Sequence, residues 1–364
     1  MHRVEQILID DLGFADTSVF NPRGVHPSVT PSLQELADAG IRLERHYAYS
    51  WCSPTRRSFL SGRFPVHISG SQAAICSNCL PLQFTLLSQK LQAAGWISHF
   101  VGKGHLGYQT TDHLPVNRGF VSSSFPAAFS RRPGSPSHPP SQAHIDSLCV
   151  HAAHLLEQTS HVGYLDGAES YQWGDHHQPW PYNHSAPDKF TKDMWLDHNP
   201  ADAIINQIFY STNFFTTEAI ARIRAHPVGP PLWIYLAYQG VHAPRLDTPS
   251  WDAMPPGSGY WDAAYGDMVH AVDTGVGNLT AAIKQRSPTM WNETLLIVLS
   301  DNGGIGPGNN FCGSACSGGT ESLRGHKLES WDGGTRTMAF IAGGWLEAHL
   351  RGTSSATFVY IADW

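Results

Sequence analysis

The stretch VEQILIDDLG, residues 4–13, decides the fold because it joins a buried strand to a pair of acidic residues. Its apolar residues over 4–9 predict a short strand that is buried on both faces of a sheet. Asp10 and Asp11 follow at once. Neighbouring residues of a strand point to opposite faces, so both carboxylates can face one ion only where the strand breaks, and Gly13 is the predicted break. Taken alone, the pattern is more typical of a solvated acidic turn.

Strand and helix patterns alternate along the rest of the chain. Further buried strands are predicted over residues 96–101, 232–237 and 295–299, and helices over 31–40, 84–94 and 265–284. The first helix has Thr30 as its expected N-cap and Pro31 at its first position. This alternation predicts an α/β fold, in which a mainly parallel sheet is covered by helices on both faces.

Polar side chains follow each of the predicted strands. They are Asp10 and Asp11, Lys103 and His105, His242, and Asp301 with Asn302. In open α/β sheets, sites form at the edge where the carboxyl ends of the strands meet. Residues two apart in an extended chain face the same way, so Lys103 and His105 are expected to point into one pocket. Carboxylate and amide oxygens from two strand ends favour Ca²⁺ or Mg²⁺ over zinc.

Length and composition limit the classes of protein to consider. The chain has 364 residues, enough for one large α/β domain or two average ones, and its 41% hydrophobic content suits a globular core. A formal charge of −7 argues against nucleic acid as a partner. No apolar run approaches the roughly 20 residues of a membrane span, and we find no internal repeat.

Two regions of the sequence lack periodicity. Residues 125–141 are rich in Pro, Ser and Arg, which predicts a flexible surface insertion. Residues 142–200 are rich in His and Trp, and we expect irregular loops that help to shape a pocket. Within them, a plain surface loop is a better interpretation of His176 and His177 than a metal site.

Sequons and cysteines bear on the cellular compartment. Three N-x-S/T sequons favour an exported protein of the secreted or lysosomal type, although chance also produces such triplets and no signal peptide is visible. The sequons begin at Asn183, Asn278 and Asn292. Apart from Cys52, five cysteines remain, and the sequence leaves their pairing open. They are Cys76, Cys79, Cys149, Cys312 and Cys316.

The most specific motif is CSPTR at residues 52–56, continued by SGR at 61–63. A lone cysteine would favour a buried thiol or half of a disulfide. The C-x-P-x-R pattern with its Gly-Arg ending, however, resembles the signature of the sulfatase family. From about residue 4 to the C-terminus the chain is similar to the arylsulfatases, and within them most similar to the arylsulfatase B group. This resemblance implies an alkaline-phosphatase-like α/β fold.

The resemblance also implies a particular nucleophile. In the family, a formylglycine-generating enzyme, which is the expected partner, oxidises the motif cysteine, here Cys52, to an aldehyde. The aldehyde hydrates to a geminal diol; one diol oxygen attacks sulfur, and the other then expels sulfate. A plain serine or thiol lacks the second hydroxyl. The implied reaction is the hydrolysis of aryl or carbohydrate sulfate esters.

A metal site is implied by the same resemblance. Oxygen ligands from two strand ends would hold a Ca²⁺ ion, with Mg²⁺ as the alternative, together with the modified Cys52. These ligands are Asp10, Asp11, Asp301 and Asn302.

Catalytic roles follow for five further residues. By the resemblance, Lys103 would bind the sulfate oxygens and His105 the diol hydroxyl. His242 would help to protonate the leaving oxygen. Lys327 would bind both the sulfate and the leaving oxygen. Arg56 would hold the diol and balance the acidic ligands.

The chain departs from the family pattern in several places. The family commonly has Trp where Gly104 stands and Glu where Asp332 stands. Its members generally also carry a leader and a C-terminal region with a small antiparallel sheet, neither of which we find. We therefore expect residues 1–364 to be a sulfatase catalytic domain without that region.

Two other functions fit parts of the sequence. The departures from the family pattern are compatible with a non-catalytic or vestigial protein that binds glycans. A phosphate or phosphonate ester hydrolase would share the metal ligands, although the motif over residues 52–63 favours sulfate.

Overall fold

A computed structural model gives the structure of the chain. It describes residues 3–21, 24–68, 80–106, 110–126, 194–197, 199–200, 210–242, 263–305 and 323–364. Ten strands form one sheet in the order β11-β2-β10-β9-β1-β8-β4-β5-β6-β7. They are β1 (Arg3–Ile9), β2 (Ile41–Leu43), β4 (Ile97–Gly102), β5 (Ser122–Pro126), β6 (Met194–Leu196), β7 (Asn199–Pro200), β8 (Leu232–Ala237), β9 (Thr294–Ser300), β10 (Ala339–Ala342) and β11 (Thr353–Ser355).

The centre of the sheet is parallel, as predicted. Strand β1 lies between β8 and β9 and runs parallel to both, and β4 joins β8 on one side and β5 on the other in the same sense. Strand β10 is antiparallel to β9. Residues Ile7, Leu8 and Ile9 are 0% exposed, because helices cover both faces of the sheet. This burial explains the continuous apolar runs in the sequence.

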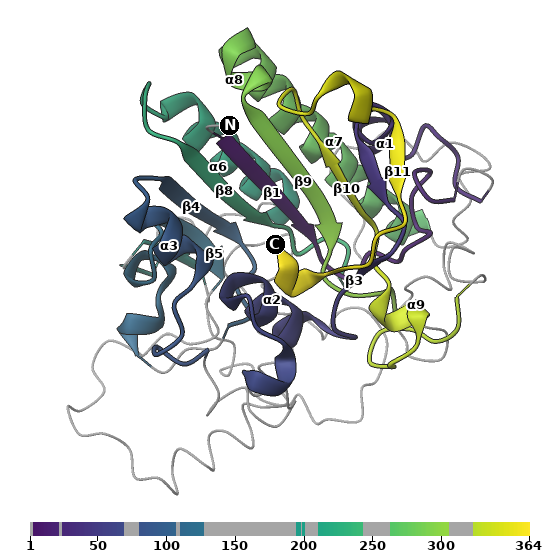
Figure 1. Ribbon diagram of the computed structural model, residues 1–364, viewed down its shortest axis with the longest axis horizontal. Helices are drawn as coiled ribbons and strands as arrows, with labels where there is room; N and C mark the ends of the chain where they lie inside the picture. The colour runs from purple at the N-terminus through teal and green to yellow at the C-terminus, as the bar shows by residue number, and fades with distance from the viewer. Residues whose placement is uncertain are drawn as a thin grey trace, which may run out of the picture.

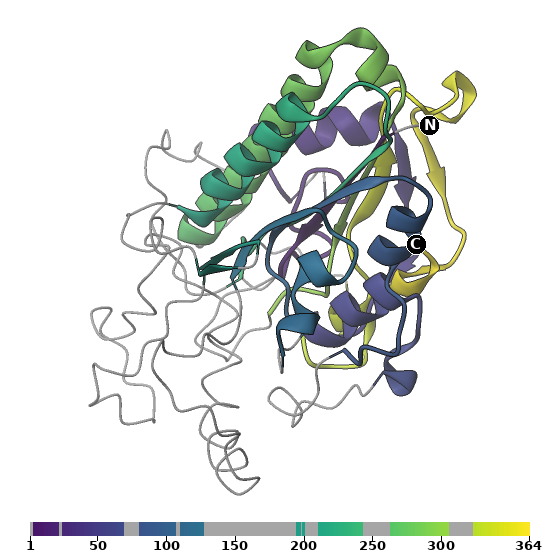
Figure 2. The same cartoon turned by 90° about the vertical axis from the view of Figure 1, so that its left-hand side faces the viewer.

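Helices pack on both faces of the sheet, which confirms the α/β fold (Figures 1 and 2). Helices α1 (Pro31–Asp38), α6 (Ser211–Ala225) and α7 (Ala263–Arg286) cover one face, and α2 (Cys52–Ser61) and α3 (Leu87–Ala93) the other. The shorter helices are α8 (Pro288–Asn292), α9 (Asp332–Thr335) and the 3₁₀ turns Pro65–His67, Thr111–His113, Pro115–Asn117 and Ala348–Leu350. Among the described helices, none is long and apolar enough to cross a membrane.

Helix α1 begins as predicted, with Thr30 in the N-cap position and Pro31 first, but another residue makes the capping hydrogen bonds. The Thr30 side chain makes no capping hydrogen bond and instead pairs with Ser18, oxygen to oxygen, at 2.9 Å. The backbone N–H groups of Ser32 and Leu33 donate to the carboxylate of Asp273 on α7, at 3.1 and 2.8 Å. The Asp273 carboxylate thus caps the helix in place of the Thr30 side chain, because the packing of α1 on α7 brings Asp273 to the end of α1.

The C-terminal segment packs against α2. Strand β12 (Val359–Tyr360) pairs with β3 (His46–Tyr47), and the 3₁₀ helix Ile361–Asp363 follows. Ile361 is fully buried in the same apolar cluster as Phe59 of α2. The Trp364 indole donates to His46 Nε2 at 3.0 Å. The last residues of the chain therefore help to fix the helix that carries Cys52.

Two regions without periodicity contain short strands. The insertion predicted over 125–141 overlaps β5 at residues 125 and 126, and its remainder lies outside the described residues. Irregular loops were expected over 142–200, yet β6 and β7 lie at its end. Strands of two or three residues are too short to show alternation. His176, His177 and the five cysteines other than Cys52 lie outside the described residues.

Candidate active site

Four neighbouring strands deliver polar side chains to one edge of the sheet. Asp10 follows β1, and its N–H donates to the carbonyl of Gly240 beyond β8 at 3.1 Å. Asp301 follows β9, and its N–H donates to Ile9 O at 3.1 Å. The Lys103 N–H, beyond β4, donates to Ala237 O at 2.7 Å. The prediction that these strand ends meet is confirmed, and Figure 1 shows α2 beside them.

The strand break that aims both acidic residues at the site lies at Asp11 itself. Asp11 has a φ of 57°, in the left-handed region that aspartate tolerates better than most residues. Gly13, the predicted break, instead donates its N–H to Asp16 Oδ2 at 2.9 Å. A Cβ on Gly13 would lie 2.4 Å from that oxygen, so glycine serves close packing there.

Cys52 begins α2 and faces the acidic pair. Its thiol donates to Asp10 Oδ1 at 3.3 Å and lies 3.8 Å from Asp11 Oδ1. The side chain is only 3% exposed. Burial, and then the carboxylates of Asp10 and Asp301, raise the pKa of the thiol well above its usual value. The unmodified cysteine is therefore a protonated, poor nucleophile at neutral pH.

Arg56 lies one helical turn after Cys52, on the same side of α2. Its Nε donates to Asp301 Oδ2 at 2.9 Å, and one terminal nitrogen lies 2.7 Å from the same oxygen. The other terminal nitrogen donates to Lys103 O at 2.8 Å. Arg56 and Asp301 are both fully buried. Burial opposes the charge of Arg56, but the carboxylates of Asp301 and Asp10 outweigh it and raise its pKa.

Lys103 and His105 follow β4 at the other side of the site. The Lys103 ammonium contacts Asp10 Oδ2. His105 has a φ of 52°, so the extended geometry that was predicted for this pair is not kept. Burial, followed by the positive charges of Lys103 and Arg56, lowers the pKa of His105 well below its usual value. A Cβ on Gly104 would meet only Phe100, at 3.7 Å, so close packing does not require glycine there.

Lys327 and His242 both contact Asp11. Lys327 Nζ lies 2.7 and 2.8 Å from the two carboxylate oxygens of Asp11, and its backbone N–H donates to Gly304 O at 2.8 Å. His242 Nε2 lies 3.4 Å from Asp11 Oδ2. Burial outweighs Asp11 and lowers the pKa of His242 to about 4. Burial alone would raise the pKa of Asp11, but the nearby Lys327 and His242 outweigh burial and lower it.

The acidic residues are arranged to hold a cation. One donor atom from each of Asp10, Asp11, Cys52 and Asp301 lies within 4.8 Å of the others. The fifth predicted ligand, Asn302, donates its amide N–H to Asp11 Oδ1 at 2.8 Å.

Two features of this cluster fit a divalent ion. The Asn302 Oδ1 atom is buried and accepts no hydrogen bond from any described residue. Burial and the nearby carboxylate of Asp10 raise the pKa of Asp301 to about 7, because carboxylates crowd together in this buried cluster. Oxygen donors of this kind suit Ca²⁺ or Mg²⁺.

The sequence did not predict a hydrogen bond between Tyr265 and Asp16 that supports the turn after the acidic pair. Tyr265 of α7 donates its hydroxyl hydrogen bond to Asp16 Oδ2 at 2.6 Å, and Gly13 N donates to the same oxygen at 2.9 Å. This contact ties the turn after Asp11 to a helix 249 residues away. Asp16 could have been suspected from its place near the acidic pair, but nothing in the sequence points to Tyr265.

Comparison with known proteins identifies the family. A family model described as Sulfatase matches residues 6–360. The chain belongs to the sulfatase family. Among curated sulfatases, arylsulfatase J of Mus musculus is 30% identical over 376 residues, which is 98% of this chain and 50% of that protein. Steryl-sulfatase of Mus musculus is 27% identical, over 92% of this chain and 56% of that protein. The chain thus spans about half the length of these relatives. Its placement in the arylsulfatase B group stays a prediction.

Solved structures share the sulfatase fold. The crystal structure of Ps i-CgsB has a TM-score of 0.69 and 23% identity, and covers 99% of this chain and 69% of that one. Phosphonate monoester hydrolase of Agrobacterium radiobacter has a TM-score of 0.56 and 16% identity, over 100% of this chain and 72% of that one. At these identities the likeness shows the fold alone, and it confirms the alkaline-phosphatase-like arrangement.

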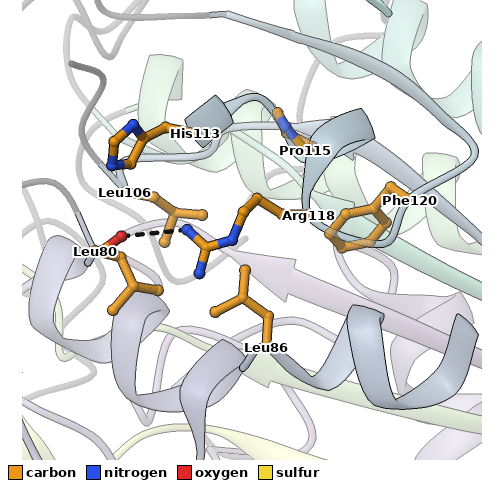
Figure 3. A pocket seen from close by; sticks show the side chains of 7 residues that line it. All are labelled: Leu80, Leu86, Leu106, His113, Pro115, Arg118 and Phe120. Carbon is orange, nitrogen blue, oxygen red and sulfur yellow. Dashed lines mark hydrogen bonds between the residues drawn. The ribbon is translucent and has the colours of Figure 1, made fainter. Parts of the chain in front are cut away.

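A small cavity elsewhere in this sulfatase has a structural explanation. Arg118 reaches into it between Leu80 and Leu86 and donates to the Leu80 carbonyl at 3.2 Å (Figure 3). It also donates to the Phe84 carbonyl at 2.8 Å. Its free volume of about 10 Å³ admits roughly one water molecule. This arginine ties the loop before α3 to the 3₁₀ turns and leaves no room for a substrate.

Proposed function

We propose that this sulfatase hydrolyses sulfate esters through a formylglycine made from Cys52, beside a bound Ca²⁺ ion. The observation that supports this most strongly is the position of Cys52. Its sulfur lies 3.3 Å from Asp10 Oδ1 within a buried cluster of carboxylates, at the N-terminus of the helix that carries the C-x-P-x-R motif. Because the thiol pKa is raised, the unmodified side chain is poorly suited to attack sulfur. A modified residue 52 would supply the hydrated aldehyde as nucleophile.

The charges around the cluster suit an anionic substrate. A sulfate ester carries one negative charge, and its hydrolysis places further charge on the leaving oxygen. Lys103 contacts Asp10 and Lys327 contacts Asp11, so two ammonium groups flank residue 52. Positioned donors of this kind are typically worth on the order of 3 kcal/mol in the barrier. With its pKa near 4, His242 is neutral at pH 7 and carries one ring N–H that can donate to the leaving oxygen.

Asp10, Asp11, Asp301 and Asn302 would hold the ion. A bound divalent cation would add positive charge beside the sulfate oxygens and relieve the crowding of the carboxylates. Arg56 keeps Asp301 in place, since its guanidinium binds one carboxylate oxygen of Asp301 and the Lys103 carbonyl at once. We infer Ca²⁺ rather than Mg²⁺ because clustered carboxylates with an amide oxygen form the flexible oxygen shell that Ca²⁺ accepts.

The substrate class and compartment belong to the same proposal. We infer an aryl sulfate or a sulfated carbohydrate as substrate, a formylglycine-generating enzyme as maturation partner, and export to a secreted or lysosomal location. One similar solved structure is described as a complex of Ps i-CgsB with a neocarrahexaose, which is a carbohydrate. Of the sequon asparagines, Asn278 and Asn292 are exposed, whereas the threonines of these two sequons, Thr280 and Thr294, are buried.

The test compares matched esters on matured protein. The chain is co-expressed with a formylglycine-generating enzyme, and the modified fraction of residue 52 is measured by mass spectrometry. We expect hydrolysis of an aryl sulfate well above that of the corresponding aryl phosphate, and none by the C52A variant. Fully modified protein without turnover would instead support a non-catalytic glycan-binding protein. Preference for the phosphate would support a phosphate or phosphonate ester hydrolase.

A further inference from the structure

A second set of metal donors overlaps the oxygen cluster. One donor atom from each of Asp11, Cys52 and His242 lies within 4.8 Å of the other two. The Cys52 sulfur is 3.8 Å from Asp11 Oδ1, and His242 Nε2 is 3.4 Å from Asp11 Oδ2. Sulfur, imidazole nitrogen and carboxylate oxygen form the donor set of a three-ligand zinc site, not of a calcium site.

We propose that, before Cys52 is modified, Asp11, Cys52 and His242 bind a thiophilic divalent ion such as Zn²⁺. This goes beyond the proposed function, because it concerns the unmodified chain and does not require the chain to hydrolyse anything. A chain whose residue 52 is formylglycine lacks this sulfur and would not offer the same donor set.

The spacing of the donors fits a tetrahedral ion. Zinc bonds to sulfur at about 2.3 Å and to nitrogen or oxygen at about 2.0–2.2 Å, so tetrahedral ligand atoms lie roughly 3.5 Å apart. Cys52 Sγ lies 3.8 Å from Asp11 Oδ1 and His242 Nε2 lies 3.4 Å from the other oxygen, Asp11 Oδ2. One donor atom from each of the three residues lies within 4.8 Å of the others, so small side-chain shifts would bring them to that spacing. Three protein ligands would leave a fourth position for water.

The local charges permit the ion to bind. Lys103, Lys327 and Arg56 contact Asp10, Asp11 and Asp301 respectively, so three positive charges balance three negative ones. On binding, the S–H bond of Cys52 breaks, its proton passes to solvent and a sulfur–metal bond forms. Thiolate and Zn²⁺ together then change the charge of the site by only one unit.

Lys327 is the natural competitor for this site. Its ammonium already lies within 2.8 Å of both carboxylate oxygens of Asp11. An ion at Asp11 must displace this contact. Neutralising the lysine should therefore strengthen zinc binding, whereas the proposed hydrolysis needs the same lysine. The failure of one proposal is thus distinguishable from the failure of the other.

The test uses Co²⁺ as a coloured substitute for Zn²⁺. The full chain is produced without the maturation enzyme, and mass spectrometry verifies an unmodified Cys52. We expect one equivalent of Co²⁺ to give a sulfur-to-cobalt charge-transfer absorption that stoichiometric Zn²⁺ abolishes and excess Ca²⁺ does not. The C52A variant, which keeps the other five cysteines, should lack it.

Three further variants locate the ion. H242A should weaken Co²⁺ binding by at least roughly 10- to 100-fold, the loss typical even of groups that only support a metal ligand. The exposed His349 provides a matched control, and H349A should bind as the parent does. K327Q should bind more tightly than the parent. Absorption that persists in C52A, or binding that is unchanged in H242A, would overturn the proposal.

Discussion

The Lys327 ammonium lies 2.7 Å from Asp11 Oδ1 and 2.8 Å from Asp11 Oδ2, across 316 residues of sequence. The contact joins the loop before α9 to the turn after β1. It also holds the Lys327 ammonium close to residue 52. It also explains why the pKa of Asp11 is lowered despite burial. In the proposed mechanism, the same lysine would hold an acidic metal ligand and bind the substrate.

Replacing Lys327 by Met should abolish most of the activity of the matured protein. Loss of one positioned charge in a buried site typically costs on the order of 3 kcal/mol in the barrier, or roughly a hundredfold or more in kcat. Steady-state hydrolysis of an aryl sulfate measures this. The exposed Lys284, whose nearest carboxylate is 3.7 Å away on Glu35, supplies the control, and K284M should be unaffected. Similar rates for both variants would remove Lys327 from the mechanism.

Arg56 should matter for stability as much as for activity. R56A leaves the fully buried Asp301 without its partner, and breaking a buried ion pair in this way typically costs about 3–5 kcal/mol. R56K keeps the charge but loses the planar fork, so we expect an intermediate loss. Urea unfolding measures both values. R3A breaks a partly exposed pair with Glu293 and should cost less than about 1 kcal/mol; an equal loss in R3A and R56A would contradict this account.

Much of this site could be predicted from sequence because its parts sit at strand ends. Asp10, Lys103 and Asp301 each follow an apolar run, and parallel strands bring such positions to one edge. The turn at Asp11 could not be predicted, since glycine is the usual residue for a left-handed φ. The Asp273 cap of α1 and the Tyr265–Asp16 contact were also missed. Both join residues more than 200 positions apart, and they depend on how helices pack rather than on local pattern.

Loss of the Tyr265–Asp16 contact should lower the affinity for Ca²⁺. Y265F removes the hydroxyl that holds Asp16, which in turn fixes the turn after Asp11. Supporting groups of this kind typically contribute roughly 10- to 100-fold to metal affinity. Calorimetric titration with Ca²⁺ measures the loss. Y238F removes a comparable buried hydrogen bond to Thr216, at 2.7 Å, and should lower stability without changing calcium affinity. Equal calcium affinity in Y265F and the parent would show that the Tyr265–Asp16 contact contributes to stability only.

His46 should make the protein less stable in acid. Burial lowers its pKa from 6.5 to about 3. Its Nε2 accepts from the Trp364 indole, which places the ring proton on Nδ1, facing Thr337. The unfolded state binds more protons between these two pKa values, so the contribution is complete above pH 6.5 and is lost as the pH falls toward 3.

The size of this effect follows from the pKa difference. At pH 4.5 we expect a loss of roughly 2 to 3 kcal/mol relative to pH 7.5. Urea midpoints at the two pH values, compared between the parent and H46Q, isolate this residue from the other titrating groups. A parent and a variant with the same pH dependence would disprove the assignment.

We propose that residue 52 acts only after conversion to formylglycine. Preparations with different extents of conversion can be made by varying the amount of maturation enzyme during expression. The modified fraction of the residue 52 peptide is read by mass spectrometry, and the rate of aryl sulfate hydrolysis is read on the same samples with saturating Ca²⁺. We predict that the rate is proportional to the modified fraction and falls to zero when no residue 52 is modified. A rate that is independent of that fraction would contradict the account.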